Sequence, residues 1–440
     1  MCLWPLVSLF TTGAQEVYMA YQRRAMELLM STVTVNGRTY QYPQRPTVLI
    51  CIDGGAPDYF ADGVRRGQLP TVQRFQEQGT YALANAVVPT FTNPNNLSIV
   101  TGAPPVIHGI SGNFFFNPYT GAEVMMNDPS FLRADTILAA LSRQGARVAV
   151  ITAKDKLRCL LGYGLQHGIC FSAEKAHEAT LAEHGIDKVN TLVGWETPEV
   201  YSSQLSEFVM EAGLRLYQQQ PPDVMYLSLT DYIQHKHAPG TPVADQFYQT
   251  LDRYFAAFDA LGAVVGITAD HGMNDKNNAT GAPHVLYLGV LLDAWCGRGT
   301  TRVILPITDP YVVHHGALGS FATIYTHPAI DLQRLVRRLK GVEGMEYVGT
   351  RVEACRDFEL PADRIGDIVV ISDHCTVLGK APQDHDLSLL DGGLRSHGGL
   401  AEQEVPLLLN KPLHPTYSQR LASTLRNFDL FELALNGVVA

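Results

Sequence analysis

Acidic and histidine side chains recur in three short motifs of this 440-residue sequence. Asp231 and His235 stand four residues apart in TDYIQHKH, a spacing that places both on one face of a helical turn. Asp270 and His271 are adjacent in TADHGM, and His397 lies in RSHGG. Carboxylates and imidazoles in such patterns are typical ligands of a divalent transition metal. The motifs therefore predict a metal site without cysteine ligands.

A sixth candidate ligand, Asp53, follows the apolar run TVLICI. Six nitrogen and oxygen ligands can hold two zinc-type ions, each with three or four ligands, and open positions are typical of a catalytic centre. The same ligand types also accept Mn²⁺ or Fe²⁺. Taken singly, each histidine is more simply a buried polar residue and each aspartate a helix cap, so the prediction depends on the combination.

The segment VPTFTNPNNLSIVTG (88–102) offers a nucleophile. Its pattern predicts that an irregular stretch gives way to a helix with Pro94 in the first turn, which places Thr92 at or near the N-cap. The helix dipole and the backbone N–H groups favour an anion there, and a neighbouring metal would lower the pKa of the hydroxyl. Two alternatives stay open: Thr92 only caps the helix, or Thr90 is the reactive hydroxyl.

Alternating strands and helices must position these residues. Continuous apolar runs are typical of parallel strands buried on both faces. Five such runs occur: TVLICI (47–52), RVAVIT (147–152), VMYLSLT (224–230), AVVGIT (263–268) and DIVVIS (367–372). Helical spacing in 133–144 and 241–261 alternates with them, and Gly145 and Gly262 follow as stops. The pattern predicts an α/β fold with a mostly parallel sheet flanked by helices.

The carboxyl ends of parallel strands collect ligands at one edge of such a sheet. Asp53, Asp231 and Asp270 each follow one of the predicted strands. We therefore expect these three carboxylates to converge.

Three segments are expected around this sheet. Residues 45–274 and 363–440 form the predicted core, and 275–362, rich in Gly, Pro and His, is predicted to be an inserted lid or cap. Residues 1–44 form an N-terminal extension. Its first part, 1–29, is predicted to be peripheral or non-native, because Met30 opens a more ordinary sequence.

Composition excludes several classes of protein. The chain has 43 Asp and Glu against 33 Lys and Arg and no basic stripe, which argues against nucleic-acid and anionic-membrane partners. No apolar run approaches the about 18 residues of a membrane span, and the apolar opening stretch lacks a basic region and a cleavage site. Seven cysteines without a CxxC pair predict no disulfide scaffold. We expect a reduced, cytoplasmic enzyme; a homodimer is left open.

The motifs, taken in order from residue 47 to residue 410, resemble those of the alkaline phosphatase superfamily. The resemblance is strongest to its nucleotide pyrophosphatase/phosphodiesterase branch and, within that branch, to the phosphonoacetate hydrolases. The segments that carry it are ICIDGG, PTFTNPNNLSIVTG, HGISGNFF, DYIQH, TADHGM and SHGG. The resemblance implies an alkaline-phosphatase-like sheet with an inserted cap.

The resemblance also implies two zinc ions and a role for each motif residue. One zinc would be held by Asp53, Thr92, Asp270 and His271. The other would be held by Asp231, His235 and His397. Asn113, in GISGN, would hydrogen-bond a phosphoryl oxygen, and Thr92 and His397 would also bind the substrate.

Lys154 and Lys156, in ITAKDKLR, lie at the end of a predicted strand. Two residues apart on an extended strand, they would face the same side and form a double positive charge. They match the lysine pair that holds a carboxylate in phosphonoacetate hydrolases. The alternative is an ordinary pair of solvated lysines.

The expected function is zinc-dependent hydrolysis of the carbon–phosphorus bond of phosphonoacetate to acetate and phosphate, through a phosphothreonine intermediate at Thr92. A phosphodiesterase or nucleotide pyrophosphatase is the first alternative. Its distinguishing feature would be an aromatic slot for a base, which the sequence does not locate, although Phe114 to Phe116 and Tyr119 lie near Asn113. A phosphosugar mutase and a metal carrier without turnover are the others.

Two further histidine motifs are assigned elsewhere. Asp373 and His374 copy the Asp270–His271 pair but lack the following glycine, so they are predicted to be structural or outer-shell residues. His314 and His315 are predicted to lie on the surface or rim of the lid.

Overall fold

The structure is a computed structural model that describes residues 31–307, 316–388, 390 and 393–439. The predictions for residues 1–29, His314 and His315 lie outside these residues. The largest element is a seven-stranded sheet with the order β4-β19-β10-β3-β9-β7-β8. Six of the seven strands point in one direction, and β19 is antiparallel to both of its neighbours. The strands are β3 (Thr47–Ile52), β4 (Thr80–Asn85), β7 (Val148–Thr152), β8 (Ile169–Ser172), β9 (Val224–Ser228), β10 (Val264–Ala269) and β19 (Glu404–Leu409).

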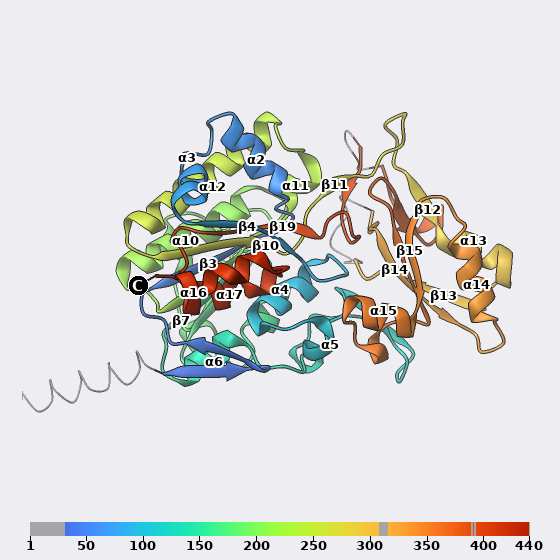
Figure 1. Ribbon diagram of the computed structural model, residues 1–440, viewed down its shortest axis with the longest axis horizontal. Coiled ribbons are helices and arrows are strands. Elements are labelled where there is room, and N and C mark those ends of the chain that lie inside the picture. Colours follow the sequence, from blue (N-terminus) through green and yellow to red (C-terminus); the bar gives the residue numbers. More distant parts are fainter. Residues whose placement is uncertain (1–30, 308–315, 389, 391–392, 440) are drawn as a thin grey trace, which may run out of the picture.

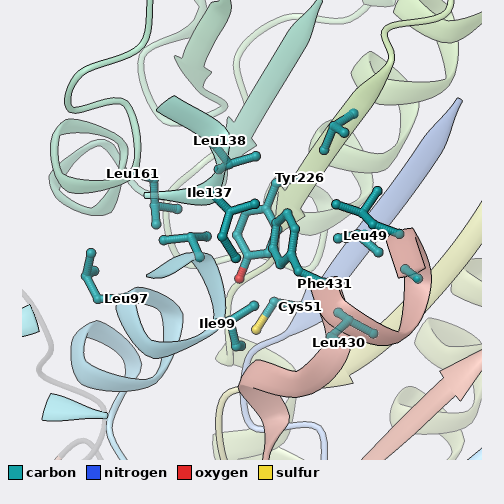
Figure 2. Packing of buried hydrophobic residues seen from close by; sticks show 14 of the residues in the cluster. Leu49, Cys51, Leu97, Ile99, Ile137, Leu138, Leu161, Tyr226, Leu430 and Phe431 are labelled. Carbon is teal, nitrogen blue, oxygen red and sulfur yellow. The ribbon is translucent and has the colours of Figure 1, made fainter. Parts of the chain in front are cut away.

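Helices cover both faces of this sheet (Figure 1). One face packs against α2 (Pro57–Arg65), α3 (Pro70–Gln78), α10 (Gln204–Gln219) and α12 (Pro242–Ala260). The other packs against α4 (Thr92–Thr101), α6 (Ile137–Arg143), α7 (Asp155–Leu161) and α17 (Leu430–Glu432). Figure 2 shows this second core, in which the rings of Tyr226 and Phe431 stack with centroids 6.1 Å apart. Burial on both faces explains the continuous apolar runs.

The sequence prediction of an α/β fold with a mostly parallel sheet is confirmed. Four of the five predicted strands belong to this sheet, but the fifth was assigned wrongly. DIVVIS forms β16 (Ile368–Ser372), which pairs antiparallel with β14 and β15 in a separate sheet. A strand buried on both faces reads the same in either sheet, which explains the error.

The second sheet has the order β13-β14-β16-β15 and is wholly antiparallel. It forms the orange lobe beside the main sheet in Figure 1. Its other strands are β13 (Thr301–Ile304), β14 (Phe321–Thr326) and β15 (Met345–Thr350), and α13 (Leu288–Cys296), α14 (Leu332–Leu339) and α15 (Arg351–Phe358) accompany them. The division into a core and an inserted cap stays a proposal, in which β16 would join the cap.

Four two-stranded ladders complete the strands of the described residues. They are β1–β2 (Thr32–Val35, Arg38–Gln41), β5–β6 (Phe114–Asn117, Ala122–Met125), β11–β18 (Asn274–Asp275, Arg395–Ser396) and β12–β17 (Val285–Tyr287, Val377–Gly379). Within the described residues, every helix is too short or too polar to cross a membrane.

Candidate active site

Three carboxylates meet at the carboxyl edge of the main sheet, as the strand pattern predicts. Asp53 directly follows β3, Asp270 directly follows β10, and Asp231 lies just beyond β9. These three strands are neighbours and run parallel, so their ends deliver the side chains to one place. All three carboxylates are at least 95% buried. Three carboxylates buried together repel one another, which indicates a cation site.

The first candidate metal group contains Asp53, Asp270 and His271. Its ligand atoms all lie within 4.8 Å of one another. His271 Nε2 is 3.2 Å from Asp53 Oδ1 and 3.8 Å from Asp270 Oδ2. Neither Asp53 Oδ1 nor His271 Nε2 makes a hydrogen bond within the described part of the chain. Two buried polar atoms that face each other in this way can share one ion.

The second candidate group contains Asp231, His271 and His397, again within 4.8 Å. His235 Nε2 is 2.9 Å from Asp231 Oδ2, and His397 Nε2 is 3.9 Å from it. The rings of His271 and His397 stack with centroids 3.7 Å apart, so His271 stands between the two groups. All six predicted side chains therefore lie in one cluster. Their division into two ligand sets stays a prediction.

The three histidines share one orientation. Each Nδ1 donates to a backbone carbonyl oxygen: His235 to Arg395, His271 to Gly272 and His397 to Thr90, at 2.8, 2.9 and 2.8 Å. A carbonyl only accepts, so Nδ1 carries a proton in each ring, and Nε2 is the nitrogen that faces the cluster and can bind an ion. This arrangement is typical of metal-ligating histidine, and the residues therefore fit a divalent ion.

Electrostatics agree with that fit. Burial and Asp231 raise the pKa of Asp53, and burial and Asp53 raise the pKa of Asp270 well above that of an ordinary carboxyl. Burial lowers the pKa of His271, but the neighbouring carboxylates of Asp270 and Asp53 outweigh this effect and raise it to about 10. Burial lowers the pKa of His397 well below its usual range. The carboxylates thus create a negative potential that a divalent ion would neutralise.

Metal removal should therefore lower the thermal stability of the folded chain. We expect zinc added to chelator-stripped protein at 100 times its dissociation constant to raise the free energy of unfolding by about 2.7 kcal/mol. The measurement is the unfolding midpoint with and without zinc. Asp231→Asn, which removes one buried ligand charge, should shrink the shift. Equal midpoints with and without zinc for the unmodified chain would contradict the metal assignment.

Asn96 connects the metal cluster to helix α4 and was not anticipated from the sequence. Its Nδ2 donates to Asp270 Oδ2 at 3.1 Å and to the Thr92 carbonyl oxygen at 3.2 Å. Its Oδ1 accepts from the hydroxyls of Tyr226 and Ser228 at 2.8 and 3.1 Å. Asn96 thereby fixes the start of α4 against the carboxylates. Its position four residues after Thr92 was the only signal.

Thr92 is the first residue of α4, and Phe91 occupies the cap position. Thr92 lines the cavity beside the metal cluster. The rival hydroxyl, Thr90, is fully buried, donates to the Gly399 carbonyl and accepts from the Gly398 N–H. Those two bonds give Thr90 a structural explanation. The placement favours Thr92 as the nucleophile, a role that stays a prediction.

Asn113 lies beside Thr92 on the loop that follows α5 (Pro105–His108). Its Oδ1 accepts from the Asn93 N–H at 3.0 Å. With that oxygen engaged, the Nδ2 donor is the part of the amide left to meet an oxygen of a ligand. This orientation supports the predicted contact with a phosphoryl oxygen.

His108 holds the same loop from inside. Its Nδ1 accepts from the Ile110 N–H, and Nε2 lies 2.9 Å from the Ser98 hydroxyl. Burial and nearby Arg364 lower the pKa of His108 to about 3. In the unfolded chain this pKa is about 6.5, so the unfolded state binds the proton first as pH falls.

Stability should therefore decline as pH falls from about 6.5 toward 3. We expect a loss of about 2 kcal/mol in the free energy of unfolding between pH 7.5 and pH 5 from His108 alone. Denaturant unfolding at the two pH values measures it, with His108→Gln as the variant that lacks the group. An identical pH dependence in both proteins would refute the assignment.

Lys154 and Lys156 both line the cavity, but their local structure differs from the predicted extended strand. Strand β7 ends at Thr152, Lys154 precedes α7, and Lys156 lies in its first turn. The expectation of an extended strand is therefore wrong, because the chain turns into a helix after Ala153. Both lysines nevertheless line the same cavity, and Lys154 Nζ is 3.7 Å from Asp231 Oδ1.

The cavity itself is small, about 60 Å³, equivalent to a few water molecules. Besides the predicted residues, its walls include six that sequence reasoning missed: Asn93, Met125, Asn127, Leu157, Leu229 and Ile307. None of the six carries a charged side chain, so their residue types alone did not mark them as site residues. The aromatic residues near Asn113 do not line it: Phe115 packs on Phe131, Phe116 packs on Tyr325, and Tyr119 is 86% exposed.

Asp373 and His374 do not join the cluster. They follow β16 in the second sheet, where Asp373 Oδ1 accepts from the Cys375 N–H and His374 is exposed. Their resemblance to the Asp270–His271 pair is therefore local only.

The fold agrees with the comparisons. The model of the type I phosphodiesterase / nucleotide pyrophosphatase family matches residues 47–398, so the chain belongs to this family. Two crystal structures of phosphonoacetate hydrolase from Sinorhizobium meliloti 1021 are 53% identical to it. Each match covers 93% of this chain and 100% of the crystallised chain, and the TM-scores are 0.89 and 0.88. One is a complex with phosphonoformate and the other with phosphonoacetate.

More distant relatives agree over shorter segments. The human ectonucleotide pyrophosphatase/phosphodiesterase family member 1 is 32% identical over 108 residues, 23% of this chain. The match spans only 12% of the human protein. The family and fold expected from the motif order are thus confirmed.

Proposed function

We propose that this chain hydrolyses the carbon–phosphorus bond of phosphonoacetate to acetate and phosphate with the help of a divalent metal. The main support is that Lys154 and Lys156 line the same cavity as Thr92 and residues of the carboxylate–histidine cluster. With divalent ions bound, the cluster side would suit a phosphonate dianion, and the lysines suit a carboxylate. The 53% identity to a hydrolase crystallised with phosphonoacetate supports the same substrate.

The metal is proposed to be zinc at two sites, one with Asp53, Asp270, His271 and Thr92 and one with Asp231, His235 and His397. Bound ions would supply Lewis-acid stabilisation of charge on the phosphoryl oxygens and lower the pKa of the Thr92 hydroxyl. The donor set, with no cysteine, also suits Mn²⁺ or Fe²⁺.

Thr92 is proposed to attack phosphorus as an alkoxide. The Thr92 Oγ–P bond forms and the C–P bond breaks, and the electron pair of that bond passes to the methylene carbon. The carbanion spreads its charge onto the carboxylate as an enediolate, which Lys154 and Lys156 stabilise. The carbon then takes up a proton from solvent water, which balances the proton that the Thr92 hydroxyl gave up, and acetate results. Asn113 Nδ2 donates to a phosphoryl oxygen, and water finally cleaves the phosphothreonine to phosphate.

A phosphodiesterase or nucleotide pyrophosphatase of the same family is the second candidate. The family assignment itself favours it. Against it, the aromatic residues Phe114 to Phe116 and Tyr119 lie outside the walls of the cavity. A nucleoside would need a surface for its base.

A panel of three compounds separates the candidates. The metal-loaded chain should turn over phosphonoacetate but not methylphosphonate, which has the same bond and no carboxylate for the lysines. Bis-p-nitrophenyl phosphate, a diester, should react with a much lower kcat/KM. Preference for the diester, or equal rates on both phosphonates, would overturn the proposal.

A further inference from the structure

Lys276 and Glu402 form a completely buried ion pair near the metal cluster. Both side chains are 0% exposed, and Lys276 Nζ lies 2.8 Å from Glu402 Oε1. Neither residue lines the cavity or belongs to a candidate metal group. Burying two charges is expensive, and an apolar pair of the same volume is often at least as stable. The pair therefore calls for an explanation other than stability.

Glu402 is bonded to both loops that carry the central histidines. Its Oε2 accepts from the Gly399 N–H at 2.9 Å, and its backbone carbonyl accepts from the Gly272 N–H at 2.8 Å. Gly399 lies two residues after His397, and Gly272 directly follows His271. Glu402 thus holds the two loops in register with each other.

Lys276 anchors the same arrangement from the opposite side. It follows β11, which pairs antiparallel with β18, and β18 ends immediately before His397. Its backbone N–H donates to the Leu394 carbonyl at 2.8 Å, just ahead of β18. Asn274, in β11, also donates to Glu402 Oε1, at 2.7 Å. The ion pair therefore links β11, which pairs with the strand before His397, to Glu402 on the segment after His397.

We propose that the Lys276–Glu402 pair is a positioning device that sets the separation of His271 and His397, and with it the affinity of the site for a divalent ion. The two rings stack at 3.7 Å, so a small shift of either loop would change both candidate groups. The inference rests on the proposed metal centre. It extends that proposal by giving a positioning role to two residues that contact neither the metal nor the substrate.

Zinc binding by the full, chelator-stripped chain provides the test, with a chromophoric chelator as competitor. Glu402→Gln should raise the dissociation constant for zinc about 10- to 100-fold, the usual cost of losing an outer-shell partner. Because this variant leaves the Lys276 ammonium buried without its carboxylate, the neutral pair Lys276→Met/Glu402→Gln is measured too. The double variant should fold and still bind zinc weakly.

Asp252→Asn is the matched control. Asp252 is also a buried carboxylate that accepts two backbone N–H groups, from Thr71 and Val72, but it joins α12 to α3 away from the cluster. It should lose thermal stability and keep the wild-type zinc affinity.

Three outcomes would overturn the inference. Wild-type zinc affinity in the folded Glu402 variants would refute the positioning role of the ion pair. It would not affect the proposal of the metal centre. An equal loss of affinity in Asp252→Asn would reduce the effect to general destabilisation. Failure of the unmodified chain to bind zinc would refute the proposed metal centre itself. This result differs from the other two, in which the unmodified chain binds zinc.

Discussion

Replacing Thr92 by alanine should lower kcat for phosphonoacetate by at least about 10⁴-fold, because Thr92 carries the only hydroxyl among the described residues that line the cavity. Thr92 begins α4 and lines the cavity, whereas the nearby Thr90 hydroxyl is occupied by two backbone bonds. Zinc affinity should fall much less, since the carboxylates and histidines remain. The measurement is phosphate release at saturating substrate, with bound zinc determined in parallel.

Thr92→Ser is the control for this prediction. Serine keeps a hydroxyl at the same backbone position, so a large part of the activity should return. Thr90→Val should weaken the fold around Gly398 and Gly399, yet the folded fraction should still form a phosphoenzyme. Full activity in Thr92→Ala, or a phosphoenzyme in that variant, would show that the nucleophile is another group.

Removing either cavity lysine should damage the reaction selectively. Lys154→Ala or Lys156→Ala should raise the barrier for phosphonoacetate by about 3–4 kcal/mol, roughly 10²- to 10³-fold in rate. The reason is that carbon is a poor leaving group, so the charge on the departing enediolate must be stabilised. The p-nitrophenolate leaving group of p-nitrophenyl phosphate needs no such help. Its hydrolysis should therefore change little.

Lys175→Ala is the matched control. Lys175 is close in sequence, half exposed and paired with Glu178 at 3.7 Å, and it does not line the cavity. It should leave both substrates unaffected. Equal losses on phosphonoacetate and p-nitrophenyl phosphate in the Lys154 and Lys156 variants would refute the leaving-group role.

The fold could be predicted where a sequence pattern has one structural explanation. Strands buried on both faces produce continuous apolar runs, so β3, β7, β9 and β10 were found close to their observed limits. The same pattern does not specify which sheet a strand joins, and β16 was therefore assigned to the main sheet. Strands β4, β8 and β19 were missed. The edge strands β4 and β8 carry a weaker apolar signal, and Pro406 interrupts the apolar run of β19.

The candidate site was predictable through its charged residues. Asp53, Asp231 and Asp270 converge because parallel neighbouring strands end at one edge. The supporting residues were not predictable, since a buried Asn96 or Glu402 acts through partners far away in the chain. Glu402 meets Lys276 across 126 positions, and no local pattern records such a contact.

Release of acetate and phosphate from phosphonoacetate tests the central claim most directly. Both products should be quantified with zinc-loaded protein and with the same protein after removal of the metal. We expect equal molar amounts of acetate and phosphate, loss of both on chelation, and recovery when zinc is restored. Phosphate release that survives complete metal removal, or no release from the loaded enzyme, would contradict the account.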